Sequence, residues 1–508
     1  MHLNLSAQNF IGLSSSNYSG IHGTLMNPAN AADSRYKVYV NIGAVGADLQ
    51  NNLLRWKAPY SILALSTKTV NPKYNAPSGL PEWKSSYYGF NSLANTSKLF
   101  FNAEIRGPAI QINFPRWGAG IAGGVRYRVF SSFTKTSPTI IQTIATGTKN
   151  PLLQNVDNTG IHGIMNFSGV NEIYASISKV LREDSRNFLK VGATAKRLTS
   201  NLNLSVNADE LDYNITPNTG NSSQDVNVQR ARGTFFHAAE TSGAFNIGWI
   251  ATQMTQLKAI GNGFGADIGF VYEYRPNYTR ERYKYKNQFI PDPEVNKYKY
   301  KFGAALTDIG FLTYSHFTDV QVGTVETANV TIEPATFYKL GSTNEFIADV
   351  EQVFTPDQAS YGRSFRVLMP AKLILHGDYL VREGFYVSGV LRQALLGKSR
   401  LGPIGYSGLS VIARFEKKYV EFAFPLTLDN DYTNLNLGAT MRAGPLFLGF
   451  DNITGWINTF NPRGLSVHAG LFWGFNHRRP GNSLLDCFFE PKAKSKKKKG
   501  LFSKRSKN

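Results

Sequence analysis

Apolar and polar residues alternate with a period of two along most of this chain, and no other feature constrains its fold as strongly. The clearest example is the run 297–306, in which Tyr298 and the other aromatic and aliphatic residues share one face and the lysines share the opposite face. The runs 121–129, 189–196 and 371–379 repeat the arrangement. Successive side chains of a strand point to opposite faces, so the pattern predicts an all-β protein whose strands have one apolar and one polar face.

Alternation alone leaves a soluble antiparallel sandwich open, because its strands also carry one apolar and one polar face. The lengths of the connections favour a barrel instead. Strands are predicted at 171–181, 365–381 and 408–415, among others. Tight turns at 182–187, 383–384, 416–418 and 443–445 alternate with longer loops, and the final strand is expected at 464–475. Short turns at one end and long loops at the other are typical of outer-membrane barrels. We predict a transmembrane antiparallel β-barrel of about 14 strands, within a range of about 12 to 16, with a periplasmic C-terminus.

Composition supports a membrane crossed by strands rather than helices. Aromatic residues make up 13% of the 508 residues and glycine contributes 46, yet no run of roughly 18 apolar residues occurs. The single cysteine, Cys487, excludes an internal disulfide framework and the usual zinc clusters. Residues 1–4 lack the features of a secretory signal, which export requires, so we expect that a signal peptide was removed.

The end of the last predicted strand carries a local signal. The segment 468–475 matches the closing-strand signature of outer-membrane barrels, in which a polar residue and a glycine precede two aromatic positions. Aromatic rings suit the headgroup layer, and a glycine permits close backbone approach. The resemblance implies that the barrel-insertion machinery reads this strand, although 33 residues follow it here. The residues that carry the match are His468, Gly470, Trp473 and Phe475.

The N-terminal segment supplies a family resemblance. Its Asn27-Pro28-Ala29 element, just before the first strand, resembles the N-terminus of FadL-type fatty-acid channels and of PorV-type barrels of type IX secretion. A family of such barrels from Bacteroidota is similar over most of residues 20–475, with further matches at 373–379 and 444–452. The resemblance implies that the N-terminal segment folds into the barrel as a hatch.

A plain turn explains the same three residues, because proline fixes φ and asparagine caps locally. Both interpretations of the element stay open at this point. The expected organisation is a hatch or plug segment at 1–35, a transmembrane barrel at 36–475 and a basic periplasmic tail at 476–508.

The polar face of the strands is expected to line the lumen, because charge is tolerated there and is costly against lipid. Such lysines and arginines would bias the lumen toward anions, for example a fatty-acid carboxylate. The basic residues predicted to face the lumen are Arg126, Arg128, Lys190, Lys297, Lys299 and Lys301.

Enzymatic chemistry finds little support in the sequence. His376, Asp378 and His468 fall on the polar face, but no serine can be paired with them from sequence, so we interpret them as polar lining. The glycine-rich 261–265 precedes a strand rather than a helix and is expected to be a hairpin or loop without phosphate-binding capacity. We therefore predict no catalytic residue, no metal site and no cofactor.

The last part of the chain is strongly basic. The formal net charge is +20, and nine lysines or arginines without any acid lie between Lys492 and the C-terminus. Such a run repels itself and is expected to be disordered. In the periplasm its partners would be anionic headgroups, the cell-wall polymer or an acidic protein, not nucleic acid; the alternative is a solvated tail without a partner. The residues expected to make these contacts are Lys492, Lys494, Lys496, Lys497, Lys498 and Lys499.

Two functions from different classes follow. The first is passage of a hydrophobic or amphipathic small molecule through a FadL-like barrel embedded in outer-membrane lipid. The second is a plugged, non-transporting scaffold subunit of an outer-membrane secretion or barrel-assembly complex, with the basic tail contacting a periplasmic component.

Overall fold

A computed structural model describes the fold. It describes residues 10–91, 96–148, 150–184, 186–217, 224–239, 259–277, 282–285, 288–292, 295–316, 319–332, 362–460 and 462–477.

Fourteen antiparallel strand positions form a closed barrel, as the sequence predicted. The last strand pairs with the first along its whole length, with Val40 opposite Trp473, so the barrel wall has no open edge. In order around the barrel the strands are β1 (Tyr36–Asn51), β4 (Ser97–Phe114), β5 (Ala119–Thr136), β6 (Asn158–Glu183), β7 (Asn187–Pro217), β9 (Gly261–Tyr274), β12 (Tyr300–Ser315), β15 (Lys372–Arg382), β16 (Phe385–Ala394), β17 (Gly408–Glu416), β18 (Val420–Asp429), β19 (Asn434–Leu437) continued by β20 (Ala439–Ala443), β21 (Leu446–Phe450) and β22 (Gly464–Asn476).

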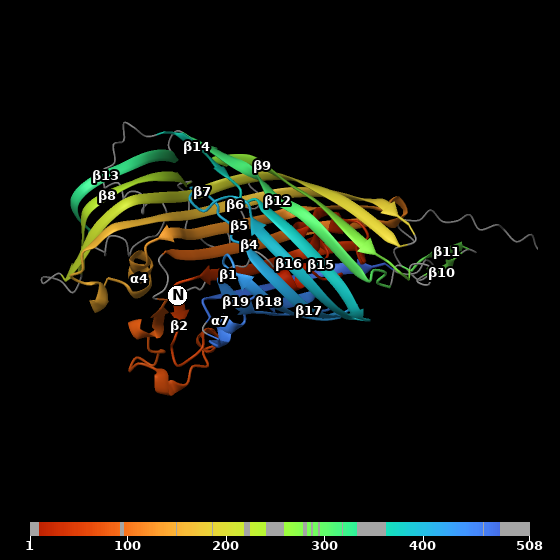
Figure 1. Cartoon of the computed structure of the whole chain (residues 1–508), viewed down its shortest axis with the longest axis horizontal. Coiled ribbons are helices and arrows are strands. Elements are labelled where there is room, and N and C mark those ends of the chain that lie inside the picture. Colours follow the sequence, from red (N-terminus) through yellow and green to blue (C-terminus); the bar gives the residue numbers. More distant parts are fainter. Residues whose placement is uncertain are drawn as a thin grey trace, which may run out of the picture.

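The two ends of the barrel differ (Figure 1). One end has short turns, for example η4 (Pro115–Trp117) between β4 and β5 and the two residues between β15 and β16. In the turn after β6, the backbone N–H groups of Arg186 and Asn187 donate to Asp184 and lower its pKa to about 2. The hairpin of β10 (Arg282–Tyr285) and β11 (Gln288–Pro291) lies at this end. Five of the six connections that join the described wall strands at this end are therefore short, as the sequence predicted, and the exception is the connection from β9 to β12, which carries this hairpin.

The long-loop end is extended on one side by additional strands. β6 has 26 residues and β7 has 31, whereas β16, β17 and β18 have 10, 9 and 10. The outer half of β7 pairs with β8 (Gln224–Ala239), β8 pairs with β13 (Val320–Ile332), and β14 (Ser364–Leu368) pairs with the outer half of β12. β9 fills the wall between β7 and β12 only as far as Gly261. The wall thus forks where β9 begins, and β8, β13 and β14 span the fork, because Val322 of β13 and Gly362, just before β14, exchange two backbone hydrogen bonds of 2.9 Å.

Three local expectations are wrong. The glycine-rich 261–265 is not a loop but the first part of β9. A glycine is needed within it because a Cβ at Gly263 would lie 1.8 Å from the Phe311 carbonyl oxygen of the neighbouring strand. The predicted strand 365–381 is broken between β14 and β15, where Pro370 has no N–H for the ladder. Tyr298 is buried rather than outward-facing, and its hydroxyl donates to Asp378 at 2.6 Å.

The outer surface of the barrel is an apolar band. Alternate residues of each strand expose large apolar side chains, while the intervening residues are buried and mostly polar. Leu375 and Tyr379 are exposed on β15, for instance, whereas His376 and Asp378 are buried. The exposed apolar residues include Ile42, Val45, Ile121, Ile177, Phe264, Phe302, Leu375, Val411, Phe424, Leu426, Met441, Leu448 and Leu471.

Short helices and a second small sheet, besides the hairpin of β10 and β11, occupy the ends and the interior. In the described residues no helix is both long and apolar enough to cross a membrane. The small sheet pairs β2 (Leu54–Trp56) with β3 (Tyr88–Phe90). The remaining helical elements are α1 (Ile11–Ser14), α2 (Ile21–Met26), η1 (Pro28–Ala31), α3 (Ile62–Ser66), η2 (Pro72–Tyr74), η3 (Ser85–Tyr87), α4 (Pro138–Thr146), η5 (Pro151–Leu153) and α7 (Thr454–Ile457).

Contact of the band with hydrocarbon is testable at Leu426, which lies exposed on β18. We expect Leu426→Arg to destabilise the barrel in lipid vesicles by about 2–4 kcal/mol, because a charge near the bilayer centre is costly. Denaturant unfolding in vesicles measures this change. Leu152→Arg, at an exposed leucine of the long-loop end, is the matched control and should leave stability nearly unchanged. Equal effects of the two substitutions would contradict a lipid-facing band.

Candidate functional site: the occupied lumen

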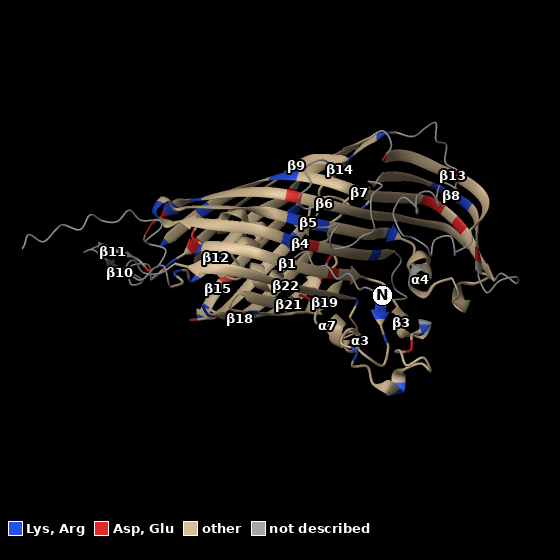
Figure 2. Cartoon of the chain, turned by 180° about the vertical axis from the view of Figure 1, so that it is seen from behind, with Lys and Arg blue, Asp and Glu red and all other residues tan. Residues whose placement is uncertain are grey.

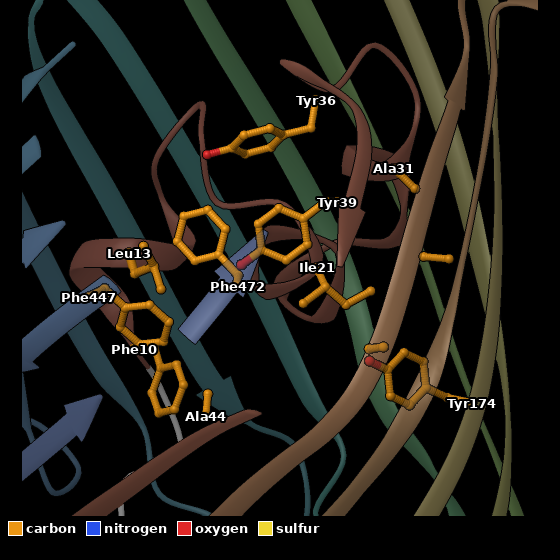
Figure 3. Close-up of a cluster of buried hydrophobic side chains, with 12 residues drawn as sticks. Phe10, Leu13, Ile21, Ala31, Tyr36, Tyr39, Ala44, Tyr174, Phe447 and Phe472 are labelled. Carbon is orange, nitrogen blue, oxygen red and sulfur yellow. The ribbon is translucent and has the colours of Figure 1, made fainter. Parts of the chain in front are cut away.

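Residues 10–33, called the luminal segment from here on, lie inside the barrel. Figure 3 shows Phe10, Leu13 and Ile21 of this segment packed among rings that the wall contributes, including Tyr39 and Phe472. The ring of Phe10 stacks on His468 at a centroid distance of 4.7 Å. The guanidinium carbon of Arg106 lies 3.8 Å from the centre of the same Phe10 ring. The segment is therefore part of the protein's core.

The Asn27-Pro28-Ala29 element forms a turn that is also seated on the wall. The Asn27 side chain accepts a hydrogen bond from the Ala29 N–H, as expected for a local cap. Its Nδ2 also donates to the carbonyl oxygens of Phe270 and Ala304, at 3.0 and 3.3 Å, and lies 3.1 Å from His376 Nε2. The two interpretations that the sequence left open thus describe one arrangement, a capped turn against the inside of the barrel.

Glycines of the wall make room for this turn. A Cβ at Gly120 of β5 would lie 2.0 Å from the Ala31 carbonyl oxygen, and one at Gly192 of β7 would lie 2.4 Å from the Pro28 carbonyl carbon. A Cβ at Gly269 of β9 would lie 2.4 Å from Asn27 Oδ1. These approaches are tighter than any side chain permits, so the wall has a glycine seat (Gly120, Gly192 and Gly269) for residues 27–31.

Buried ion pairs cross the lumen beside the segment. Asp308 accepts from both terminal nitrogens of Arg128, at 2.9 and 3.0 Å, and from Lys196 at 2.8 Å. Arg126 donates to Glu172 at 2.6 Å, and Glu172 also pairs with Arg128. All five side chains are buried, and Figure 2 shows positive and negative residues adjoining on the strands of this region.

One ion pair and several hydrogen bonds to charged side chains hold the luminal segment near the short-turn end. Arg275 donates to Asp33 at 2.5 Å, and Lys190 donates to the Ala32 carbonyl oxygen at 3.1 Å. On the opposite wall, Ser16 donates to Glu421 at 2.7 Å and the Asn17 N–H donates to Glu416 at 3.1 Å. The segment is thus fixed to both sides of the barrel by charge-assisted hydrogen bonds, which are the stronger kind.

The structure places the six predicted basic residues in two groups. Arg126, Arg128 and Lys190 are buried in the lumen, and Lys301 lies 3.6 Å from Asp378 and donates to Asn17. Lys297 and Lys299 precede β12, and Lys299 Nζ lies over the ring of Tyr379 at the rim.

Sequence reasoning missed the acids that neutralise the luminal bases. Glu104, Glu172, Asp267 and Asp308 each pair with a basic residue in the barrel. Glu172 occupies an inward position of a predicted strand, so the alternation itself was a signal that could have found it. The expected bias of the lumen toward anions loses its basis, because these bases are already paired.

A loop from the long-loop end folds inward as a second obstruction. Residues 395–407 connect β16 to β17, and Thr134 and Asn166 of the facing strands donate to the carbonyl oxygens of Lys398 and Arg400. The Tyr406 hydroxyl donates to buried Asp48 of β1, and the Gly402 N–H donates to Asn166. We call residues 395–407 the crossing loop.

An apolar cluster lies in the lumen around the fork in the wall. It combines residues of β5, β6, β7, β8, β12, β13 and β14, and the Tyr314 ring stacks on Phe365 at 4.7 Å. It contains none of the ion pairs described above. Its buried members are Phe130, Val170, Leu198, Ala238, Leu312, Tyr314, Val320, Phe365, Val367 and Met369.

The remaining predicted residues lie as follows. His468 is buried against Phe10, a Cβ at Gly470 would strike the Phe447 ring, and Trp473 and Phe475 are exposed on the outer surface. The six lysines of the tail lie outside the described residues. Among the described residues, no group of three or more His, Cys, Asp or Glu side chains could hold a metal ion.

Similar solved structures are barrels of low sequence identity. A mutant of the TodX monoaromatic hydrocarbon channel is 9% identical, covering 91% of this chain and 95% of that chain with a TM-score of 0.38. The toluene transporter TbuX of Ralstonia pickettii is 11% identical, covering 94% and 100% with a TM-score of 0.39. A Pseudomonas aeruginosa FadL homologue is 10% identical, covering 93% and 99% with a TM-score of 0.29. TM-scores below 0.5 are too low for these similarities to carry an argument.

A comparison with curated proteins finds no match. The profile of a family of unknown function, DUF5723, matches residues 28–451, which is most of the chain and includes the glycine seat and the luminal ion pairs. The chain belongs to the DUF5723 family.

Proposed function

We propose that the protein is an outer-membrane barrel of a Gram-negative bacterium that admits an apolar small molecule. The membrane location is supported by the closed wall, the apolar outer band and the separation of short turns from long loops. A closed sheet of this kind satisfies every backbone hydrogen bond without water, as the bilayer interior requires.

The observation that carries the proposed passage is the apolar cluster at the fork in the wall. Small-molecule sites are mostly apolar concavities with few polar groups. Here apolar side chains gather in a lumen whose other walls carry charge, and they do so where β9 ends between β7 and β12. A neutral apolar molecule fits this chemistry better than an anion, since the luminal bases described above are paired with acids.

A scaffold role is the second candidate, and the occupied lumen favours it. The luminal segment and the crossing loop obstruct the lumen at two levels, and hydrogen bonds to Arg275 and Glu416 fix the segment to opposite walls. Buried ion pairs of the wall, such as Arg126 with Glu172, lie beside the segment, and breaking such a pair by removing one partner costs about 3–5 kcal/mol. A lumen closed in this way suits a protein that binds partners through its outer surface or its tail and does not transport a molecule.

Uptake of a neutral fluorescent probe, N-phenylnaphthylamine, by cells producing the protein tests passage. We expect faster uptake than in cells without the protein, and a several-fold loss with Leu312→Asn, because this change places an amide of similar volume in the apolar cluster. Thr427→Val, at a buried polar position of β18, is the matched control and should retain uptake. Uptake that is the same with and without the protein would exclude this function.

The glycine seat gives a test of whether the luminal segment blocks the barrel. We expect Gly192→Val to force residues 28–29 away from the wall and to produce ion conductance in planar bilayers where the unchanged protein gives little. The control is Gly389→Val on β16, because a Cβ there meets no atom within 4 Å. Conductance that is equally low in both variants, with both folded, would contradict a blocking role.

The scaffold candidate predicts partners that depend on the basic tail. We expect stoichiometric proteins to co-purify from native membranes with the full chain and to be lost when residues 478–508 are removed. The comparison uses quantitative mass spectrometry of the two purified samples. Purification of the full chain without partners, together with probe uptake by the cells that produce it, would decide for passage.

A further inference from the structure

The first long loop folds into a small unit of its own. Residues 52–91, called the loop module, contain β2, β3 and α3 around an aromatic centre. The Trp56 ring lies 4.9 Å from Trp83 and 5.9 Å from Tyr60 between ring centroids, and its Nε1 donates to the Tyr60 carbonyl oxygen at 2.9 Å. The module has a fixed structure and is more than a connection between β1 and β4.

The module projects sideways from the barrel beside α7, as both Figure 1 and Figure 2 show. The Asn458 side chain, just after α7, donates to the Ala58 carbonyl oxygen at 3.3 Å and ties the module to this side of the wall. The tall extension formed by β7, β8 and β13 rises elsewhere on the same end of the barrel.

Strand lengths place this side of the barrel at the membrane surface. A transmembrane strand needs about 9–11 residues to cross the hydrocarbon. β16, β17 and β18 have 10, 9 and 10 residues, so their long-loop ends lie close to the headgroups. Leu435 and Leu437 of β19 are exposed and extend the apolar band to this level. The module begins at this level as well: β1 and β4, which carry it, have 16 and 18 residues, but the side chain of Asn434, which pairs with Asp429 at the end of β18, donates to the Asn51 carbonyl oxygen at the end of β1 at 2.7 Å.

The surface of the module combines apolar and basic residues. Leu80 is 68% exposed, Trp83 is 49% exposed, and Phe460 beside α7 is 86% exposed. The module carries a single acid, Glu82, which pairs with Lys84 at 2.8 Å. Its five basic residues are Arg55, Lys57, Lys68, Lys73 and Lys84.

We propose that the loop module docks on the outer leaflet, with Leu80, Trp83 and Phe460 entering the interface and its lysines binding phosphate-bearing lipid headgroups. Tryptophan and exposed aliphatic residues favour the interface, and each lysine near an anionic surface strengthens binding. A membrane fits better than a soluble partner because the module lies beside the wall that carries the apolar band. This inference rests on the proposed membrane location of the barrel.

Fluorescence of a probe attached at single cysteines tests the proposal in vesicles. In a Cys487→Ser background, the probe nitrobenzoxadiazole is attached to Leu80→Cys, to Leu426→Cys on the apolar band, and to Leu152→Cys, which is 84% exposed on η5. We expect doxyl-labelled lipids to quench the probe at positions 80 and 426, several-fold more strongly than at position 152.

The three positions separate the possible failures. Quenching at 426 with none at 80 would overturn the docking of the module while leaving the membrane barrel intact. Absence of quenching at all three positions would overturn the membrane location and the docking with it.

A charge test uses the same probe at position 80. We expect doxyl-labelled lipids to quench it more in vesicles that contain phosphatidylglycerol than in vesicles of phosphatidylcholine alone. This difference should disappear when four lysines are changed together to Gln, namely Lys57, Lys68, Lys73 and Lys84. The matched control changes Arg182, Arg186, Lys417 and Lys418, at the short-turn end, to Gln and should preserve it. Quenching that is independent of lipid charge in the unchanged protein would overturn the headgroup contact.

Discussion

Charges can be kept inside this barrel only as partners of one another, and the arrangement of the lumen depends on that constraint. An isolated buried ion costs several kcal/mol even after relaxation. Asp308 meets it by accepting from Arg128 and Lys196 together, at a position in β12 where the register with β9 shifts and its own φ is +58°. The irregularity of the strand therefore places one carboxylate where two cations from other strands converge.

The same constraint explains how an N-terminal segment without regular strand structure can be buried. Its backbone polar groups need partners, because an unpaired buried amide costs about as much as a lost hydrogen bond. Lys190 donates to the Ala32 carbonyl oxygen, and Glu416 accepts from the Asn17 N–H. The charged side chains of the wall thus form hydrogen bonds with the backbone of the segment as well as ion pairs with one another. Wall and segment therefore form one core.

Sequence patterning predicted the wall well and the interior poorly. The period of two and the tight turns predicted most strands of the C-terminal half to within a few residues, since both are local signals; the predicted 408–415 is observed as Gly408–Glu416, whereas 365–381 is broken at Pro370. The patterning also pointed to Arg126 and Arg128 as inward-facing. It did not identify Asp308 as their partner, because that pairing joins residues about 180 positions apart. The glycine seat at Gly120, Gly192 and Gly269 could not be predicted for the same reason. These three glycines lie on different strands and come to face residues 27–31 only when the barrel closes.

The unequal heights of the wall give the long-loop end its two environments. Where strands have about ten residues, a loop that follows them emerges at the headgroups, and exposed leucine or tryptophan there has lipid within reach. Where β6 and β7 continue for 26 and 31 residues, the same end rises well beyond the bilayer, and their connections meet water. Leu80 lies between β1 and β4, which have 16 and 18 residues, whereas Leu152 lies between β5 and β6, which have 18 and 26 residues. The loop that carries Leu152 ends on the longer strand β6, so we expect it to reach farther from the bilayer than the loop that carries Leu80. We therefore expect strand length, a property of the wall alone, to determine which loops reach lipid.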